Sequence, residues 1–183
     1  MGKLIAWEIV SVDGFFAGSH GELDWFVVDR EFTECSADML NHAETLLFGR
    51  LTYDLMKAYW PTPAAMKNDP VVAERMNNLP KIVFSRTLKT LAWNGSELRP
   101  EIVPEEIVKM KQQSGKDLMI LGSAAVLSAF TRLGLMDEYR LIVAPVVLGS
   151  GQALFRDIPA KIKLKLLRTR QFQSGNVLLC YGP

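Results

Sequence analysis

The sequence predicts an α/β fold whose mixed sheet has a parallel core and an antiparallel C-terminal edge. Three observations support this prediction. Short apolar strands alternate with helical segments along most of the chain, strands outnumber helices, and two strand-like segments around a turn end the sequence. The 183 residues contain no internal repeat and no linker-like stretch, so we expect a single domain spanning residues 1–183.

The N-terminal elements follow from their hydrophobic patterns. Lys3 to Val10 consists mainly of apolar and β-branched residues, typical of a buried strand. Residues 11–21 contain three glycines and are expected to form a loop that lets the backbone approach a ligand closely. Apolar residues recur at helical spacing over residues 30–44, and Thr45 to Phe48 then reads as a second strand. A short helix over residues 52–56 is expected next.

The middle of the chain is expected to contain an irregular segment, a further strand and a helix. Residues 59–70 contain three prolines, which predict an irregular, surface-exposed segment. Lys81 to Phe84 is a third strand. Pro104 is expected to begin a helix, because Glu105 and Glu106 follow it at positions that the helix dipole favours for acidic side chains.

The clearest local unit is a strand, a turn and a helix. Leu118 to Leu121 is an apolar strand, and Gly122 with Ser123 forms a turn. Residues 124–133 place apolar side chains on one helical face, and Gly134 is expected to end that helix.

The last third of the chain is predicted to be mostly strand. Glu138 to Pro145 is a strand, and the glycines of the following VLGSGQALF segment indicate a loop. Lys161 to Phe172 and Val177 to Tyr181 are then expected to form an antiparallel hairpin around residues 174–176.

Composition excludes several classes of function. The formal net charge of +1 gives no electrostatic basis for binding nucleic acid or an anionic membrane. Neither a signal peptide nor a spanning segment is recognisable, so a cytoplasmic protein is expected. The two cysteines and two histidines are isolated from one another, which disfavours a zinc site, any other metal site built on them, and a histidine-based triad.

Three segments place glycine or small polar residues directly after a strand, where α/β sheets bind nucleotides. Glycine there permits close approach of a phosphate, a following helix start presents free N–H groups, and an arginine can grip an oxyanion. Taken singly, each segment is also explained as an ordinary turn after a strand, without any ligand. The full G-x-G-x-x-G and G-x-x-x-x-G-K-[ST] patterns are absent. The residues concerned are Gly49, Arg50 and Thr52, then Ser85 and Arg86, then Gly122, Ser123 and Ala124.

The order of these motifs resembles the dihydrofolate reductase superfamily. The segments SVDGFFAG (11–18), LLFGRLTY (46–53), LGSAAVL (121–127) and VAPVVLGSG (143–151) are most similar to the C-terminal reductase domain of the bifunctional riboflavin deaminase-reductase. The stand-alone bacterial members match best, and the resemblance covers essentially the whole chain. It implies a three-layer, dihydrofolate-reductase-like fold with helices on both faces of the sheet.

The resemblance also implies an NADPH-dependent reductase and assigns residues to the cofactor. Gly49, Arg50 and Thr52 would surround its phosphates, and Gly122, Ser123 and Ala124 would hold the pyrophosphate. Ser85 and Arg86 would meet the adenosine 2′-phosphate. The nicotinamide would lie against Ala6 and the loop from Val12 to Ala17.

Asp13 and Asp24 are the candidate proton donors for hydride transfer to an acceptor. The alternatives are a turn-initiating role for Asp13 and a helix N-cap for Asp24. Dihydrofolate reductases carry their acidic residue inside the first helix, whereas this chain has Leu23-Asp24-Trp25-Phe26 at the comparable stretch. Trp25, Phe26 and Tyr53 are expected to stack on a planar substrate.

Two classes of function therefore stay open. One is a reductase acting on a pterin-like or 5-amino-6-(5-phosphoribosylamino)uracil-like heterocycle. No basic cluster that would receive a ribose phosphate stands near the first loop. The other is a non-catalytic nucleotide- or ligand-binding protein on the same fold. A homodimer formed through the terminal strands is compatible with either function.

Overall fold

The computed structural model describes all residues, 1–183, and contains an eight-stranded sheet with the order β5-β4-β3-β6-β1-β7-β10-β9. The strands are β1 (Leu4–Ser11), β2 (Phe15–Ala17), β3 (Ala43–Gly49), β4 (Lys81–Phe84), β5 (Ser96–Arg99), β6 (Asp117–Leu121), β7 (Glu138–Ala144), β8 (Gln152–Ala153), β9 (Lys165–Gln171) and β10 (Val177–Gly182). The helices are α1 (Arg30–Asn41), α2 (Arg50–Tyr59), α3 (Pro63–Asn68), α4 (Pro70–Asn78), α5 (Pro104–Gln113) and α6 (Ala124–Arg132).

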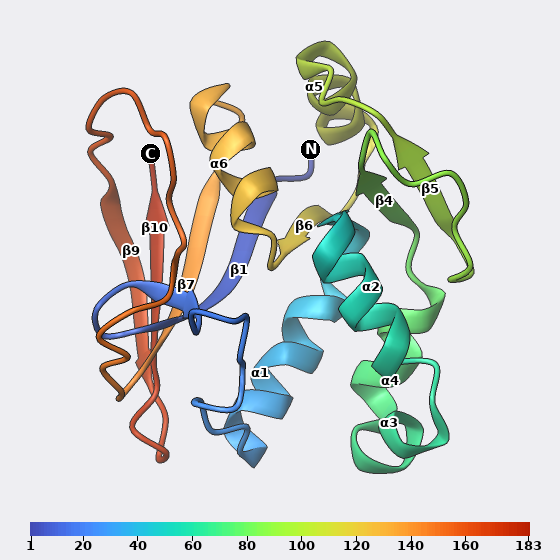
Figure 1. Ribbon diagram of the computed structural model, residues 1–183. Coiled ribbons are helices and arrows are strands. Elements are labelled where there is room, and N and C mark those ends of the chain that lie inside the picture. Colours follow the sequence, from blue (N-terminus) through green and yellow to red (C-terminus); the bar gives the residue numbers. More distant parts are fainter.

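The sheet is parallel from β5 to β7 and antiparallel at its C-terminal edge, where β10 pairs with β7 and β9 pairs with β10 (Figure 1). This confirms the predicted mixed sheet and its terminal hairpin. Gly175 turns between the two hairpin strands with a φ of +88°. A separate pair of short strands, β2 and β8, joins the loop after β1 to the loop after β7.

Helices cover both faces of the sheet, as the predicted three-layer fold requires. Side chains of β1 alternate between the two layers, with Ile5 and Trp7 facing α1 and α4, and Leu4 and Ala6 facing α5 and α6. The apolar face predicted for residues 124–133 is buried against the second layer. None of the helices is long and apolar enough to cross a membrane.

One expected loop is helical. The prolines of residues 59–70 begin helices rather than interrupt them: Pro63 is the first residue of α3 and Pro70 the first residue of α4. Proline suits this position, because the first helical residue has no intrahelical partner for its N–H. Thr62 caps α3 by accepting a hydrogen bond from the Ala65 N–H at 3.2 Å. The expectation of an irregular segment was therefore wrong.

Element ends also differ from the prediction. The first helix ends at Asn41 instead of residue 44, because Ala43 already pairs with Asp117 of β6. The second helix is longer than expected and starts at Arg50. Short strands β2, β5 and β8 were not predicted; β5 has the polar sequence SELR at a sheet edge, which lacks an apolar alternation.

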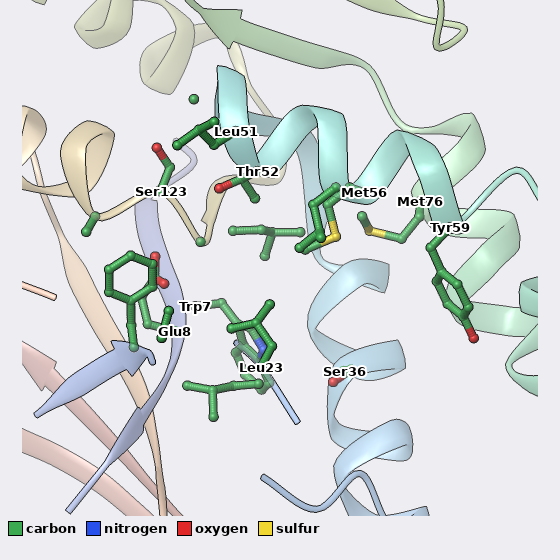
Figure 2. Close-up of a pocket in the computed structure, with 18 of the residues that line it drawn as sticks. Trp7, Glu8, Leu23, Ser36, Leu51, Thr52, Met56, Tyr59, Met76 and Ser123 are labelled. Atoms are coloured by element: carbon green, nitrogen blue, oxygen red, sulfur yellow. The ribbon is translucent and has the colours of Figure 1, made fainter. Parts of the chain in front are cut away.

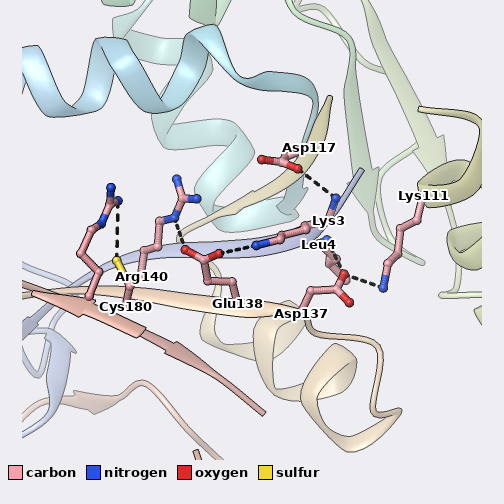
Figure 3. Close-up of polar contacts among 9 residues, drawn as sticks. Lys3, Leu4, Lys111, Asp117, Asp137, Glu138, Arg140 and Cys180 are labelled. Atoms are coloured by element: carbon pink, nitrogen blue, oxygen red, sulfur yellow. Dashed lines mark hydrogen bonds and ion pairs between the residues drawn. The ribbon is translucent and has the colours of Figure 1, made fainter. Parts of the chain in front are cut away.

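Ion pairs connect the N-terminal end of β1 to neighbouring elements (Figure 3). They lie at the edge of the sheet opposite the carboxyl ends of β3 and β6. The Glu138 carboxylate, on β7, binds Lys3 Nζ at 3.1 Å and Arg140 Nε at 2.7 Å. Burial acts to raise the pKa of Glu138, but these hydrogen bonds and charges outweigh it and hold the pKa below its ordinary value. Glu138 is thus a buried carboxylate whose charge is fully paired.

Candidate functional site

A single large cavity of about 930 Å³ opens beyond the carboxyl ends of β3 and β6 and beside the second half of β1. Its lining comes from both layers of helices. In open α/β sheets this edge is the usual place for ligands. Figure 2 shows Ser123 and Thr52 at one end of the cavity and Tyr59 at the other, with Met56 and Met76 between α2 and α4.

Two helices begin at the first end of the cavity. Gly49 ends β3 and is the N-cap of α2, while Ser123 follows β6 and is the N-cap of α6. Neither N-cap uses a side chain to cap its helix, so the first-turn N–H groups are free of side-chain partners. Both helix starts line the cavity. Two uncapped N-termini facing one space form an arrangement suited to a diphosphate.

The two junctions are in direct contact, and only glycine fits between them. A Cβ atom on Gly49 would lie 2.2 Å from Ser123 Oγ and 3.2 Å from Val126 Cγ2. A Cβ atom on Gly122 would lie 2.9 Å from Thr52 Cγ2, and Gly122 has a φ of +61°. Ser123 has a left-handed φ of +64°, which is uncommon for a non-glycine residue. The backbone here is held in one specific shape.

Two arginines supply the positive charge of the cavity. Arg50 is exposed at the start of α2, as expected from the sequence. Arg156 lies after β8, and its Nε donates to the Ala153 carbonyl at 3.2 Å while its backbone N–H donates to Ser128 Oγ at 3.0 Å. Arg156 was not predicted, because only the pairing of β8 with β2 brings its segment to the cavity.

The other end of the cavity is a chamber between α1, α2 and α4 that is lined almost wholly by apolar side chains. Asp69, the N-cap residue of α4, carries the only charge there. We call this part the apolar chamber; its main lining residues are Trp7, Leu23, Phe26, Val28, Phe32, Thr33, Ser36, Met39, Leu40, Met56, Tyr59, Trp60, Asp69, Val72 and Met76. Such a surface favours an uncharged ring and excludes water from it.

Glu8 is a buried acid in the cavity wall that sequence reasoning missed. It is 2% exposed, and its Oε1 atom has no hydrogen-bond partner. Burial raises the pKa of Glu8 well above its ordinary value. The signal in the sequence was a lone carboxylate inside an otherwise apolar strand. Figure 2 shows its carboxyl group directed into the cavity.

Only some of the residues expected around the nicotinamide line the cavity. Ala17 lines the cavity, and so do Trp7 and Glu8. Ala6 is fully buried under α6 instead, because its side chain points into the packed core of that layer. Val12 is exposed, and its N–H donates to the Val146 carbonyl at 2.9 Å, outside the cavity lining.

Asp13 joins two loops and does not line the cavity. Its carboxylate accepts hydrogen bonds from Ser11 Oγ at 2.6 Å and from the N–H groups of Leu148 and Gly149 at 3.1 and 2.8 Å. The hydrogen bond from Ser11 is the main reason that the pKa of Asp13 is lowered. An ionised carboxylate engaged in this way is not suited to donate a proton, so the geometry disfavours the expected role of Asp13 as an acid.

The segment around Asp24 lines the cavity with Leu23 and Phe26 but not with Asp24 itself. Asp24 is exposed in a turn and is not the N-cap of α1; that position belongs to Asp29, which accepts from the Phe32 N–H at 2.7 Å. Phe26 lines the cavity as expected. Trp25 does not, since its indole packs edge-on against Phe26 and donates to the Glu22 carbonyl.

Tyr53 and the strand-end pair Ser85 and Arg86 also lie outside the cavity lining. Tyr53 is buried, and its hydroxyl accepts from the N–H groups of Ala92 and Trp93 at 3.1 and 2.9 Å. Stacking of Tyr53 on a substrate is therefore contradicted. Ser85 and Arg86 directly follow Phe84, which does line the cavity.

The chain is similar to known proteins over nearly its full length. The model of the RibD C-terminal domain matches residues 2–178. Protein YyaP of Bacillus subtilis (strain 168) is 38% identical over 174 residues, which cover 94% of this chain and 90% of YyaP. A putative riboflavin biosynthesis protein from Shewanella sp. PV-4 superposes with a TM-score of 0.76 at 19% identity, covering 98% of both chains.

The fold also extends to the dihydrofolate reductases. The enzyme of Enterococcus faecalis, solved in complex with NADP(H), superposes with a TM-score of 0.64 at 16% identity, covering 99% of this chain and 96% of that one. This likeness shows a shared dihydrofolate-reductase-like fold. The match to the family model over residues 2–178 goes further, and the protein belongs to the RibD C-terminal domain family.

Proposed function

We propose that the protein is an NADPH-dependent reductase that transfers hydride to a small heterocyclic acceptor, of a pterin-like or aminouracil-like kind. The observation that carries the proposal is the contact between the Gly49 and Gly122 junctions, which directs two uncapped helix starts into one cavity that continues into the apolar chamber. Membership of a reductase-domain family and the likeness to an NADP(H)-bound dihydrofolate reductase support it.

The residues present fit such a cofactor. The N–H groups after Gly49 and Gly122 are placed for its pyrophosphate, and Arg50 and Arg156 offset the negative charge. NADPH supplies a hydride when bound. The chain itself orients the acceptor in the apolar chamber and keeps water away from the reacting atoms, which strengthens the electrostatic interactions inside.

The test is a calorimetric titration of the cofactor-free protein with NADPH and, in parallel, NADH at moderate salt. We expect saturable binding with a clear preference for NADPH. Absence of binding by either cofactor would contradict the proposal. Binding without reduction of pterins or aminouracil phosphates would favour the alternative, a ligand-binding protein.

Cofactor selectivity gives a second expectation. Exchanging Arg50 and Arg86 together for alanine should weaken NADPH binding at least tenfold more than NADH binding, because only NADPH carries the 2′-phosphate that charge-assisted hydrogen bonds recognise. Parallel titrations of both cofactors measure the effect. Arg75→Ala, at an exposed position of α4 outside the cavity, is the matched control. Equal losses for the two cofactors would remove these arginines from the 2′-phosphate site.

We also propose a homodimer formed through β9. This strand is one of the two edges of the sheet, and all seven of its residues are exposed, including Leu166 and Leu167. The double variant Leu166→Asp, Leu167→Asp is expected to be monomeric in light scattering coupled to gel filtration. Leu133→Asp, at an exposed leucine after α6, should leave the wild-type mass unchanged. A monomeric wild type would contradict the proposal.

A further inference from the structure

Glu8 has no structural partner that explains its presence in a buried strand. An ionised carboxylate without a counter-charge is expensive to bury, so such residues are normally paired or uncharged. Glu138 on the neighbouring strand β7 illustrates the paired case, with two cations on its carboxylate. Glu8 is the opposite case, since burial alone accounts for its shifted pKa.

The surroundings of Glu8 offer it no charge. Trp7 is the last β1 residue paired with β6, so Glu8 stands beside the gap that β6 leaves by ending at Leu121. On its other side, Glu8 is in register with Leu141 of β7. The start of α6 that lines the cavity is Ala124, Ala125 and Val126. The cations of the cavity are Arg50 of α2 and Arg156 after β8, and neither is among the causes of the raised pKa of Glu8.

The apolar chamber also lacks any group that would attract an anion. It contains no lysine or arginine, and its one charge, Asp69, is negative. A phosphate or carboxylate on the acceptor would lose its hydration there without gaining a counter-charge. A phosphorylated acceptor is therefore a poor fit, although a structurally similar protein of Thermotoga maritima is named as a reductase of 5-amino-6-(5-phosphoribosylamino)uracil, which carries a phosphate.

We propose that Glu8 is the proton donor of this site and that the acceptor is an uncharged planar molecule. Its apolar body lies in the chamber, on the α1 side of the sheet, and its carbonyl or imine reaches the Glu8 carboxyl, on the α6 side, through the gap beyond the end of β6, which the same cavity spans. This inference rests on the proposed reductase function. As the hydride forms a new C–H bond, the C=O or C=N π electrons move to the heteroatom. That atom takes the proton from Glu8, leaving a carboxylate that water reprotonates.

The protonation state of Glu8 can be measured without any cofactor. With a folded-state pKa above the unfolded one, the folded protein binds more protons above about pH 4.3, so wild-type stability falls as pH rises towards the folded pKa. Relative to wild type, Glu8→Gln should gain about tenfold in its folding equilibrium constant per pH unit across that window. Urea unfolding at several pH values measures this gain. Glu105→Gln, at an exposed position of α5, is the control and should show no such slope.

The role in proton transfer is tested by kinetics with NADPH and 7,8-dihydropterin as an uncharged probe acceptor. Glu8→Gln should lower kcat about 100-fold while changing the KM for the acceptor and the affinity for NADPH less than threefold. The wild-type kcat should fall as pH rises through the folded pKa of Glu8, and this dependence should be absent from the variant. A structural role alone would leave the pH profile unchanged.

The acceptor class is tested by titrating the NADP⁺-bound protein with 5-amino-6-(5-phosphoribosylamino)uracil and with the same compound after removal of its phosphate. We expect the dephosphorylated compound and 7,8-dihydropterin to bind at least tenfold more tightly than the phosphorylated one. Tighter binding of the phosphorylated compound, or no binding of either uncharged probe, would overturn the acceptor class. A pH-independent stability difference for Glu8→Gln would overturn the donor, whereas failure to bind NADPH would instead overturn the proposed function.

Discussion

Gly122→Ala is expected to lower NADPH affinity more than 100-fold. The new Cβ would lie 2.9 Å from Thr52 Cγ2, and a φ of +61° is unfavourable for an alanine. We expect the start of α6 to move away from the start of α2, and that movement separates the N–H groups that face the diphosphate. Calorimetric titration with NADPH measures the loss.

Gly134→Ala is the matched control for that substitution. Gly134 also has a left-handed φ, of +66°, but nothing lies within 4 Å of the position of a Cβ there, and it follows the far end of the same helix. The control carries the conformational cost of alanine without the clash. We expect a loss of about 1 kcal/mol in stability and unchanged NADPH affinity. Equal losses of affinity in the two variants would assign the effect to backbone strain in α6 rather than to the shape of the junction.

Lys81→Met is expected to lower the free energy of unfolding by about 3 kcal/mol at pH 7. Lys81 is only 1% exposed, and its Nζ donates to the carbonyls of Asn77, Leu79 and Asn94 at 3.0, 2.7 and 3.2 Å. It also lies 4.5 Å from the centre of the Trp93 ring. Methionine fills a similar volume but leaves these carbonyls without a donor. Urea denaturation measures the loss.

The pH dependence of this variant follows from the position of Lys81. Burial lowers the pKa of its ammonium from 10.5 to about 8. Between these values the unfolded chain binds more protons than the folded one, so wild-type stability rises with pH across that window, and the Lys81→Met variant should lack this rise. Lys109→Met, at an exposed position of α5, is the control for loss of a lysine. A variant as stable as wild type would show that the three carbonyls find other partners.

Much of the fold was predictable because the buried strands can be recognised from their apolar sequences. The cores of β1, β3, β4 and β6 are continuous apolar runs, and the hairpin of β9 and β10 is punctuated by Gly175. Proline was misread in residues 59–70 because the same residue both ends and begins helices. Only the capping by Thr62 shows that Pro63 stands at a helix start.

The site was predictable where local backbone geometry defines it. Gly49, Arg50, Thr52 and the segment from Gly122 to Ala124 lie together in the cavity as expected, because parallel strands end at one edge of the sheet. The side chains that line the rest depend on tertiary pairing. Tyr53 looked available for stacking, but two backbone N–H groups from the chain after β4 bind its hydroxyl.

The roles of the acidic residues also depend on tertiary contacts that the local sequence does not indicate. Asp13 followed a strand at a glycine-containing turn, and nothing local indicated that the N–H groups of Leu148 and Gly149 would occupy its carboxylate. Glu8 was not singled out from the sequence, although it is the one carboxylate within residues 3–10. Its burial arises because β1 is covered by helices on both faces and pairs with β7 at Glu8.

The central claim is that the cavity binds NADPH with its pyrophosphate between the two helix starts and its nicotinamide beside Glu8. A crystal structure of the protein grown with NADPH tests this most directly. We expect density for the pyrophosphate at the N–H groups after Gly49 and Gly122, and for the nicotinamide within contact distance of Glu8 and Ala17. Density for NADPH elsewhere on the molecule, or a cavity occupied by another ligand in the presence of saturating NADPH, would contradict the account.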